Sequence, residues 1–436
     1  MIITFFGLAI LLIGPALIAA AEFYAPLGEL GWAWIGTVLV IMVADNLLSR
    51  WAAKIEAERQ VDEKLSLGTN NEVEIILYSR SRRPLFLQVK DDPPIEFETA
   101  RRQCSLRLEP YQTQRIAYRT VPQSRGNYQF GDIHIRGRSI LALTWWQRRI
   151  PAQQQVRVYP DLLQVHRYEL LARKIHLQQA GFRLMRRRGE GTEFESLRDY
   201  VPDDDFRDID WKASARRNKP ITREYEIERS QNVMLMIDAG RMMCSQLEGM
   251  SKLDYAINAA LMLAYVASRQ GDAVGMMVFA GAVSSFIPPR KGSAQIGRLV
   301  EELYAVQPTL TEPDYAAALT MLQSRSRKRS LVVIFTDIID KQASRALLAY
   351  SGALYPHHLP LVVTIRDPRL EQTADLYPHE ATEVYQRAIA AGLLRDRSQA
   401  LAALRRQGAR VVDATPDELT VSAVNRYLDI KARQLL

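Results

Sequence analysis

The sequence predicts a multi-domain protein with an N-terminal two-helix membrane hairpin, a small antiparallel β-sandwich and a C-terminal α/β domain. Three observations support this: two long apolar stretches near the start, short alternating strands after them, and long apolar strands alternating with helices beyond residue 231. The 436 residues exceed one typical domain, and about three units are expected at roughly 150 residues each. We predict a hairpin over 1–50, a sandwich-like domain over 60–165, a signature segment over 185–230 and the α/β domain over 231–436.

Two apolar stretches predict the hairpin. Residues 1–21 carry no charge, and a helix of this length rises roughly 31 Å, close to the thickness of a bilayer's hydrocarbon core. Residues 30–48 carry only Asp45. A cleaved signal peptide is the alternative, suggested by the alanines at 19–21, but a positive leader is missing and a second span follows at once.

Charges around the hairpin predict its orientation. The connecting loop holds Glu22 and Glu29, whereas Arg50, Lys54 and Arg59 follow the second span. Basic residues favour the cytoplasmic side, so we expect a multi-pass protein of the inner membrane with both ends and the bulk of the chain in the cytoplasm.

Alternation of apolar residues distinguishes the next two domains. Short runs such as 73–77 and 85–89, separated by turn signals at 91–94 and 124–127, predict the antiparallel sandwich. Later segments predict a parallel sheet covered on both faces. Its strands are expected at 233–237, 273–279, 331–335 and 361–365, and its helices at 253–269, 294–304, 382–406 and 416–433.

Composition and motifs exclude several classes of protein. The net charge of +8 is a modest surplus that a membrane surface explains as well as nucleic acid does, and no nucleic-acid partner is expected. Cys104 and Cys244, the only cysteines, are too few for a disulfide framework or a four-cysteine zinc site. The sequence lacks a phosphate-binding P-loop, a nucleophile elbow and a metalloprotease motif, so we do not expect the chain to hydrolyse ATP.

Residues 193–217 form the densest feature of the sequence, in which acids and bases alternate with aromatic residues. Three interpretations are open: a solvated linker, a docking surface of Arg–carboxylate pairs fixed by buried aromatics such as Tyr200, Phe206 and Trp211, or a carboxylate cluster for a divalent metal. Without a nucleophile or a companion histidine, docking is favoured. The candidate partner-binding residues are Glu193, Arg198, Tyr200, Asp204, Arg207, Asp210, Trp211 and Arg216.

This segment resembles the signature of the MoxR-associated, membrane-anchored family with a von Willebrand factor A-like domain, known as domain-of-unknown-function family fifty-eight. The one departure noted is Asp203, where the family usually has Gly. The order of hairpin, sandwich and α/β domain extends the resemblance over nearly the whole chain. The matching residues are Gly191, Glu193, Phe194, Leu197, Arg198, Tyr200, Asp204, Arg207, Ile209, Asp210, Trp211, Ser214, Ala215 and Arg216.

The resemblance implies a Rossmann-like von Willebrand A fold for the C-terminal domain and a MoxR-type AAA+ ATPase as partner, with other proteins of a membrane complex. It also implies a chaperone-like role in assembly or maturation rather than catalysis. Two rival functions stay open. One is a metal-dependent binding module, and the other is a membrane-bound hydrolase using the carboxylates between Asp203 and Asp210.

In von Willebrand A domains, a metal is held by an Asp-x-Ser-x-Ser sequence, a threonine and a second aspartate, which the resemblance places here at Asp238, Thr311 and Asp337. Gly240 and Met242 stand at the two serine positions and provide no oxygen ligand. Mg²⁺ requires near-octahedral oxygen coordination, so we expect at most weak binding and no resident cofactor.

Without a metal, the two carboxylates Asp238 and Asp337 would repel each other. We therefore expect a compensating charge, with Arg241 or a backbone donor at the start of the following helix as the candidate.

Overall fold

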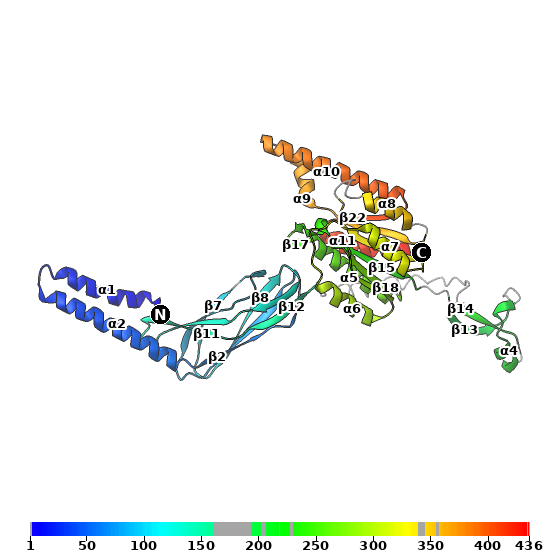
Figure 1. Cartoon of the computed structure of the whole chain (residues 1–436). Coiled ribbons are helices and arrows are strands. Elements are labelled where there is room, and N and C mark those ends of the chain that lie inside the picture. Colours follow the sequence, from blue (N-terminus) through cyan, green and yellow to red (C-terminus); the bar gives the residue numbers. More distant parts are fainter. Residues whose placement is uncertain are drawn as a thin grey trace. The chain divides into compact units, whose positions relative to one another are not determined.

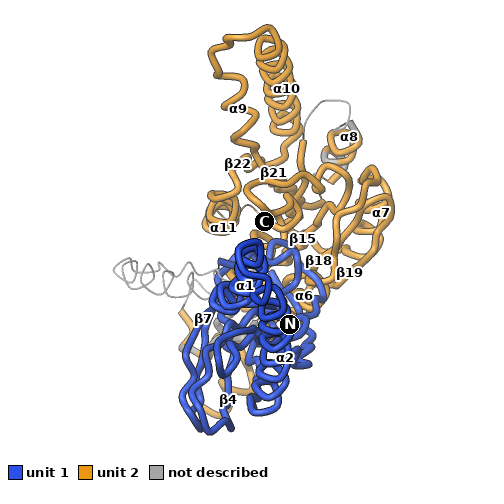
Figure 2. Tube along the Cα trace, turned by 90° about the vertical axis from the view of Figure 1, so that its left-hand side faces the viewer, with its two compact units in different colours: residues 1–161 blue, residues 162–436 orange. Residues whose placement is uncertain are grey.

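The computed structural model describes residues 2–100, 102–160, 193–201, 206–217, 219–226, 230–338, 345–354, 357–433 and 435. The chain divides into two compact units, Met1–Asp161 and Leu162–Leu436 (Figures 1 and 2). The predicted boundaries at residues 165 and 185 lie outside the described residues.

Two apolar helices, α1 (Phe5–Ala20) and α2 (Pro26–Ala52), pack against each other as an antiparallel pair (Figure 1). Glycines permit their close approach: a Cβ atom built on Gly14 would lie 2.3 Å from Cγ1 of Ile35. Among the described residues, α2 is the one helix long and apolar enough to cross a membrane, whereas α1 is a shorter apolar helix.

The prediction that the first helix begins at residue 1 was wrong. Ile2–Ile3 form a short strand, β1, that pairs with Trp145 and Thr144 of β11 (Thr144–Ile150). Thr4 then caps α1, because its side chain accepts a hydrogen bond from Gly7 N at 3.0 Å. The first residues are thus tied to the β domain rather than continuing the helix.

The β domain consists of three sheets with the strand orders β1-β11-β10-β5-β7, β2-β4-β8-β6 and β3-β12-β9. The pairing is antiparallel, as predicted, except that β3 and β12 are parallel. Ile75, Leu77, Leu87 and Trp146 belong to its buried core. The other strands are β2 (Ile55–Gln60), β3 (Lys64–Ser66), β4 (Asn71–Ser79), β5 (Leu85–Lys90), β6 (Phe97–Thr99), β7 (Gln103–Leu108), β8 (Thr113–Pro122), β9 (Gly126–Phe130), β10 (Ile133–Arg138) and β12 (Gln154–Tyr159).

Arg59 does not act as a membrane-flanking charge as the sequence suggested. Its guanidinium is buried in the β domain, forms an ion pair with Asp91 and donates to the carbonyl of Gly131 at 3.0 Å. Of the basic residues that predicted the orientation, Arg50 and Lys54 remain exposed.

The signature segment folds into an antiparallel pair of strands, β13 (Glu193–Asp199) and β14 (Ile221–Glu226). Between them lie the 3-10 turn η1 (Phe206–Asp208) and the short helix α4 (Trp211–Arg217). We call residues 193–226 the signature hairpin.

The C-terminal region is an α/β domain, as predicted. Its sheet has the order β19-β18-β15-β20-β21-β22, and every neighbouring pair is parallel except β18 with β19. The strands are β15 (Asn232–Asp238), β18 (Ala273–Phe279), β19 (Val283–Arg290), β20 (Ser330–Thr336), β21 (Leu359–Ile365) and β22 (Arg410–Ala414), with a small hairpin of β16 (Gln246–Leu247) and β17 (Met250–Ser251).

Helices cover both faces of this sheet (Figure 1). Alternate residues of β15 point to opposite faces, so Leu235 packs in the core with α5 and α11, and Met236 packs in the core with α7, α8 and α10. The helices are α5 (Lys252–Arg269), α6 (Ser293–Tyr304), α7 (Tyr315–Arg325), α8 (Arg345–Leu354), α9 (Pro368–Asp375), α10 (Ala381–Arg406) and α11 (Pro416–Ala432), and the 3-10 turn η2 spans Arg241–Cys244.

Candidate functional site

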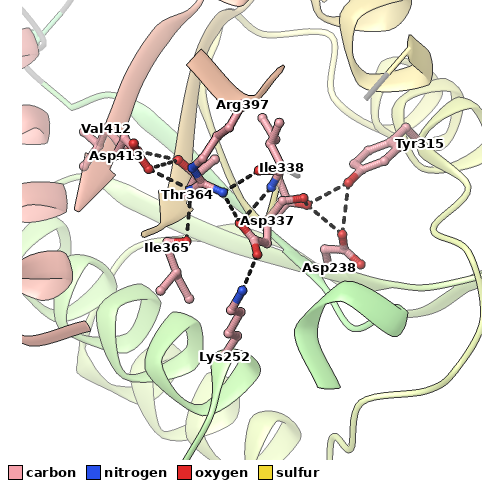
Figure 3. Close-up of polar contacts among 11 residues, drawn as sticks. Asp238, Lys252, Tyr315, Asp337, Ile338, Thr364, Ile365, Arg397, Val412 and Asp413 are labelled. Atoms are coloured by element: carbon pink, nitrogen blue, oxygen red, sulfur yellow. Dashed lines mark hydrogen bonds and ion pairs between the residues drawn. The ribbon is translucent and has the colours of Figure 1, made fainter. Parts of the chain in front are cut away.

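A polar cluster lies at the carboxyl edge of the parallel sheet (Figure 3). Asp238 is the last residue of β15, and Asp337 directly follows β20. Because these strands are neighbours and parallel, their carboxyl ends meet at one edge, where ligands of open α/β sheets usually bind. The structure therefore brings together the two aspartates that the sequence singled out.

Asp238 is fully buried and satisfied by neutral donors. Its Oδ1 accepts from Gly240 N at 2.7 Å, and its Oδ2 accepts from Thr336 Oγ1 at 2.7 Å and from Tyr315 Oη at 3.0 Å. Burial raises the pKa of Asp238, although these hydrogen bonds oppose the shift. Burial and the Asp238 charge raise the pKa of the Tyr315 hydroxyl well above its ordinary value, which keeps this donor protonated.

Asp337 is also buried but is paired with two cations. Its Oδ2 accepts from Lys252 Nζ at 2.5 Å, and its Oδ1 accepts from Arg397 Nη1 at 2.7 Å. Ile338 N donates a further bond to Oδ1 at 2.8 Å. Burial alone would raise the pKa of Asp337, but Arg397 and Lys252 outweigh it and hold the pKa below its ordinary value.

Arg397 links the carboxyl ends of three strands. Besides Asp337, its Nη2 donates to Asp413 Oδ1 at 2.7 Å and to the carbonyl of Ile365 at 2.9 Å. Thr364 Oγ1 donates to the same oxygen of Asp413 at 2.9 Å. Since Arg397 belongs to α10, this side chain also fixes that helix to the edge of the sheet.

Gly240 occupies the first of the two missing serine positions for a steric reason. A Cβ atom there would lie 2.9 Å from the carbonyl oxygen of Thr311 and 3.0 Å from both Asp238 Oδ1 and Pro313 Cδ. The close approach to Thr311 is reinforced by a hydrogen bond from Arg241 N to the same carbonyl, at 2.9 Å. The loop is packed around a glycine.

These residues do not fit a Mg²⁺ site. Both oxygens of Asp337 are occupied by cationic groups, and both oxygens of Asp238 accept hydrogen bonds from the protein. Thr311 lies at this edge, but its hydroxyl bonds to that of Thr309 at 2.8 Å. In the described part of the chain, no three His, Cys, Asp or Glu side chains gather as metal ligands. A metal ion would have to displace the Lys252 ammonium or bind beside it.

Of the two expected compensators, Arg241 was wrong, whereas a backbone donor is present: Gly240 N, at the N-cap of the 3-10 turn η2, donates to Asp238 Oδ1. Arg241 pairs instead with Glu312 at 2.8 Å on the surface, and Lys252 and Arg397 supply the positive charge. The sequence carried one signal for Lys252: a lysine in the first turn of a helix opposes the helix dipole and needs a local acidic partner. Nothing in the sequence pointed to Arg397.

In the signature hairpin, Asp210 has a structural role. Its Oδ1 accepts from Lys212 N and Ala213 N, each at 3.0 Å, and so caps helix α4. Ser214 Oγ donates to the Asp210 carbonyl at 2.7 Å and accepts from Ile221 N at 2.8 Å, which joins the helix to β14. Backbone and cap hydrogen bonds therefore hold the fold of the hairpin tip.

The prediction that Trp211 and Phe206 are buried in the hairpin was wrong. Trp211 is 68% exposed and Phe206 is 71% exposed, although Phe206 contacts Tyr200 with ring centroids 5.7 Å apart. In the described part of the hairpin, the buried apolar side chains are Ile209 and Ile221.

The structure describes only some of the remaining candidates of the signature. Arg207 and Arg216 are exposed. Asp204 lies outside the described residues, as do the side chains of Glu193 and Arg198.

Comparison with known proteins finds a family model that matches part of the chain. Residues 196–384 match a family described as "Protein of unknown function DUF58", the domain-of-unknown-function family that the signature resembles, and this match begins after Gly191, Glu193 and Phe194 of the signature. The chain is 27% identical over 232 residues to the uncharacterized protein Rv1480 of Mycobacterium tuberculosis (strain ATCC 25618 / H37Rv), which covers 51% of this chain and 72% of that protein. It is also 27% identical over 238 residues to the uncharacterized protein YeaD of Bacillus subtilis (strain 168), covering 52% and 59%.

Solved structures show only low similarity. Native alpha-2-macroglobulin from Escherichia coli gives a TM-score of 0.22 at 16% identity, over 25% of this chain and 17% of that one. The CARDB domain of the PF1109 protein from Pyrococcus furiosus gives a TM-score of 0.19 at 13% identity, over 24% and 88%.

Proposed function

We propose that the protein is a non-enzymatic, membrane-anchored interaction module that docks a partner protein through its signature hairpin. The proposed partner is a MoxR-type AAA+ ATPase acting in chaperone-like assembly, as the resemblance of the signature implies. The anchor is the α1–α2 pair, which we propose as a two-pass hairpin with the rest of the chain in the cytoplasm.

One observation carries this proposal: two large aromatic side chains, Trp211 and Phe206, are 68% and 71% exposed at the tip of the signature hairpin. Hydrogen bonds of Asp210 and Ser214 already fix the tip. Exposed aromatics on an ordered frame lose little side-chain entropy on binding, and tryptophan is enriched among residues that dominate binding energy.

The polar cluster supports a structural role for the sheet edge. Lys252 and Arg397 neutralise Asp337 from within the protein, so the edge is closed by internal ion pairs. The metal-dependent rival therefore has no open pair of carboxylates at this edge. For the hydrolase rival, the structure assigns Asp210 to capping helix α4.

Direct binding tests the proposal. The full-length protein in nanodiscs is titrated with a purified MoxR-type ATPase from the same organism, and Trp211→Ala and Phe206→Ala are compared with the parent. Each substitution should weaken binding by about 2 kcal/mol, or roughly thirtyfold in Kd, as for a hot-spot aromatic. Tyr377→Ala serves as the matched control, because Tyr377 is a similarly exposed aromatic on the α/β domain.

Equal affinity of the two hairpin variants and the parent would contradict docking through the signature hairpin. Addition of EDTA distinguishes the proposed docking from the metal-dependent rival, because the proposed docking should persist when divalent ions are removed. A hydrolase would instead show turnover that is abolished by Asp204→Asn.

A further inference from the structure

The turn between β10 and β11, residues 139–143, lies against the apolar helices rather than in open solvent. Leu143 is buried between them in a cluster with Val38 and Met42. Its carbonyl accepts a hydrogen bond from Thr4 N at 3.0 Å, at the start of α1. The β domain therefore meets the helix pair through this turn.

Two apolar side chains at the tip of the turn stay exposed. Ile140 is 49% exposed and Leu141 is 53% exposed. At the same level, Leu47 and Leu48 of α2 are exposed as well, so the turn extends the apolar surface of the helices. Exposed apolar side chains beside a membrane helix are suited to contact with lipid.

The amides at the tip of the turn are hydrogen-bonded within the protein. Ser49 Oγ accepts from Ile140 N at 2.9 Å, and Asp45 Oδ1 accepts from Leu141 N at 3.1 Å. Ala142 N donates to the carbonyl of Ser139 at 3.0 Å. A turn that enters lipid must pair its amides within the protein, because each unpaired amide is costly there. This also explains Asp45, the charged residue that interrupts the apolar stretch of α2.

The depth of the turn agrees with the thickness of a bilayer. From Glu29 to Ser49, α2 rises roughly 30 Å at about 1.5 Å per residue, which equals the hydrocarbon core. Ser49 and the turn bonded to it then lie at the boundary between acyl chains and headgroups.

Basic residues lie just beyond this boundary. The β4–β5 turn is joined to the end of α2 by a hydrogen bond from Arg80 N to the Lys54 carbonyl at 2.8 Å. Lys54 lies two residues beyond the end of α2 and five residues after Ser49, away from the apolar stretch of the helix. Arg80 pairs with Glu56, but Arg82, Arg83 and Lys54 add exposed positive charge at this level.

We infer that the β10–β11 turn inserts Ile140 and Leu141 into the bilayer interface while the β4–β5 turn contacts anionic lipid headgroups. The β domain is thereby held against the membrane surface by a third contact in addition to the two helices. This inference rests on the membrane anchoring proposed above.

Quenching by lipids tests the inference. The full-length protein is placed in nanodiscs that contain anionic lipid and lipids brominated on their acyl chains, with Cys104 and Cys244 replaced by serine. A bimane label is attached at Leu141→Cys, at Val40→Cys within α2, or at Ile95→Cys. Ile95 is 91% exposed in the β5–β6 turn, at the end of the strands away from the helices, and is the negative control.

We expect the bromolipids to reduce the emission of the labels at positions 141 and 40 but not at position 95. Quenching at 40 without quenching at 141 would overturn the insertion of the turn and leave the anchor intact. Absence of quenching at both positions would overturn the membrane anchor itself. The headgroup contact is tested by the double substitution Arg82→Gln with Arg83→Gln. It should reduce quenching of the label at position 141 in anionic nanodiscs but not in neutral nanodiscs. An equal effect of the double substitution in the two kinds of nanodisc would contradict the headgroup contact.

Discussion

Replacing Lys252 with methionine should destabilise the α/β domain by removing one of the two cations that neutralise Asp337. The side chain of Lys252 is 6% exposed and that of Asp337 is fully buried, so water screens this pair little. Loss of one partner of a buried pair costs about 3 to 5 kcal/mol. Because Arg397 stays in contact with Asp337, we expect the lower end, about 3 kcal/mol.

Hydrogen exchange is the appropriate assay because it resolves the domains. All six tryptophans precede residue 231, so tryptophan fluorescence does not report on unfolding of the α/β domain. The amides of β20 lie next to the cluster in the centre of the sheet and should exchange only when the domain opens. Loss of about 3 kcal/mol should accelerate this exchange by roughly 150-fold.

Two controls make the result interpretable. Lys328→Met removes an exposed lysine of the same domain and should leave the exchange of β20 unchanged. Asp337→Asn combined with Lys252→Met should cost less than the sum of the single substitutions, because the two side chains interact directly. Equal exchange of β20 in Lys252→Met and Lys328→Met would show that the Lys252–Asp337 ion pair does not stabilise the domain.

Three further predictions follow from the same structure. The pKa of Asp337 is lowered in the folded state, so its contribution to the free energy of unfolding is present above the ordinary carboxyl pKa and is lost as the pH falls through the lowered value. In acid denaturation, the difference in stability between the parent and Asp337→Asn should therefore narrow below about pH 4. A difference that stays constant with pH would contradict this. Gly240→Ser introduces a side chain that could bind a metal, but its Cβ meets the Thr311 carbonyl, so the substitution should lower the stability by about 1 to 3 kcal/mol. Calorimetric titration of this variant should still show no binding of Mg²⁺ or Mn²⁺. Micromolar binding would favour the metal-dependent rival. A fluorescent protein fused after Leu436 should be fluorescent and alkaline phosphatase fused there inactive, and the reverse would overturn the cytoplasmic orientation.

Periodicity in the sequence determined most of the secondary structure. Residues of β15 alternate between two buried faces, and the run of apolar residues from 233 to 237 already indicated a strand covered on both sides. Likewise, the helices predicted at 382–406 and 416–433 differ from α10 and α11 by one residue at one end of each. Local patterns suffice to predict these strands and helices because the period of the apolar residues alone determines which face of the element is buried.

Contacts between distant segments decided the candidate site. Lys252 and Arg397 come from separate helices and meet Asp337 only because the strands place their carboxyl ends at one edge. No spacing in the sequence encodes such a meeting, which is why Arg241, the basic residue nearest to Asp238 along the chain, was the wrong choice.

The burial of individual side chains also depends on the tertiary structure. Trp211 and Phe206 were expected to be buried in the signature hairpin because large aromatics usually avoid water, yet the buried apolar side chains described there are Ile209 and Ile221. Ile2 and Ile3 were expected in a helix, but pairing with β11 satisfies their backbone instead. The apolar segments and their period could thus be predicted from local sequence, whereas the side chains that these segments cover depend on the volume and hydrogen-bond partners that distant segments bring together.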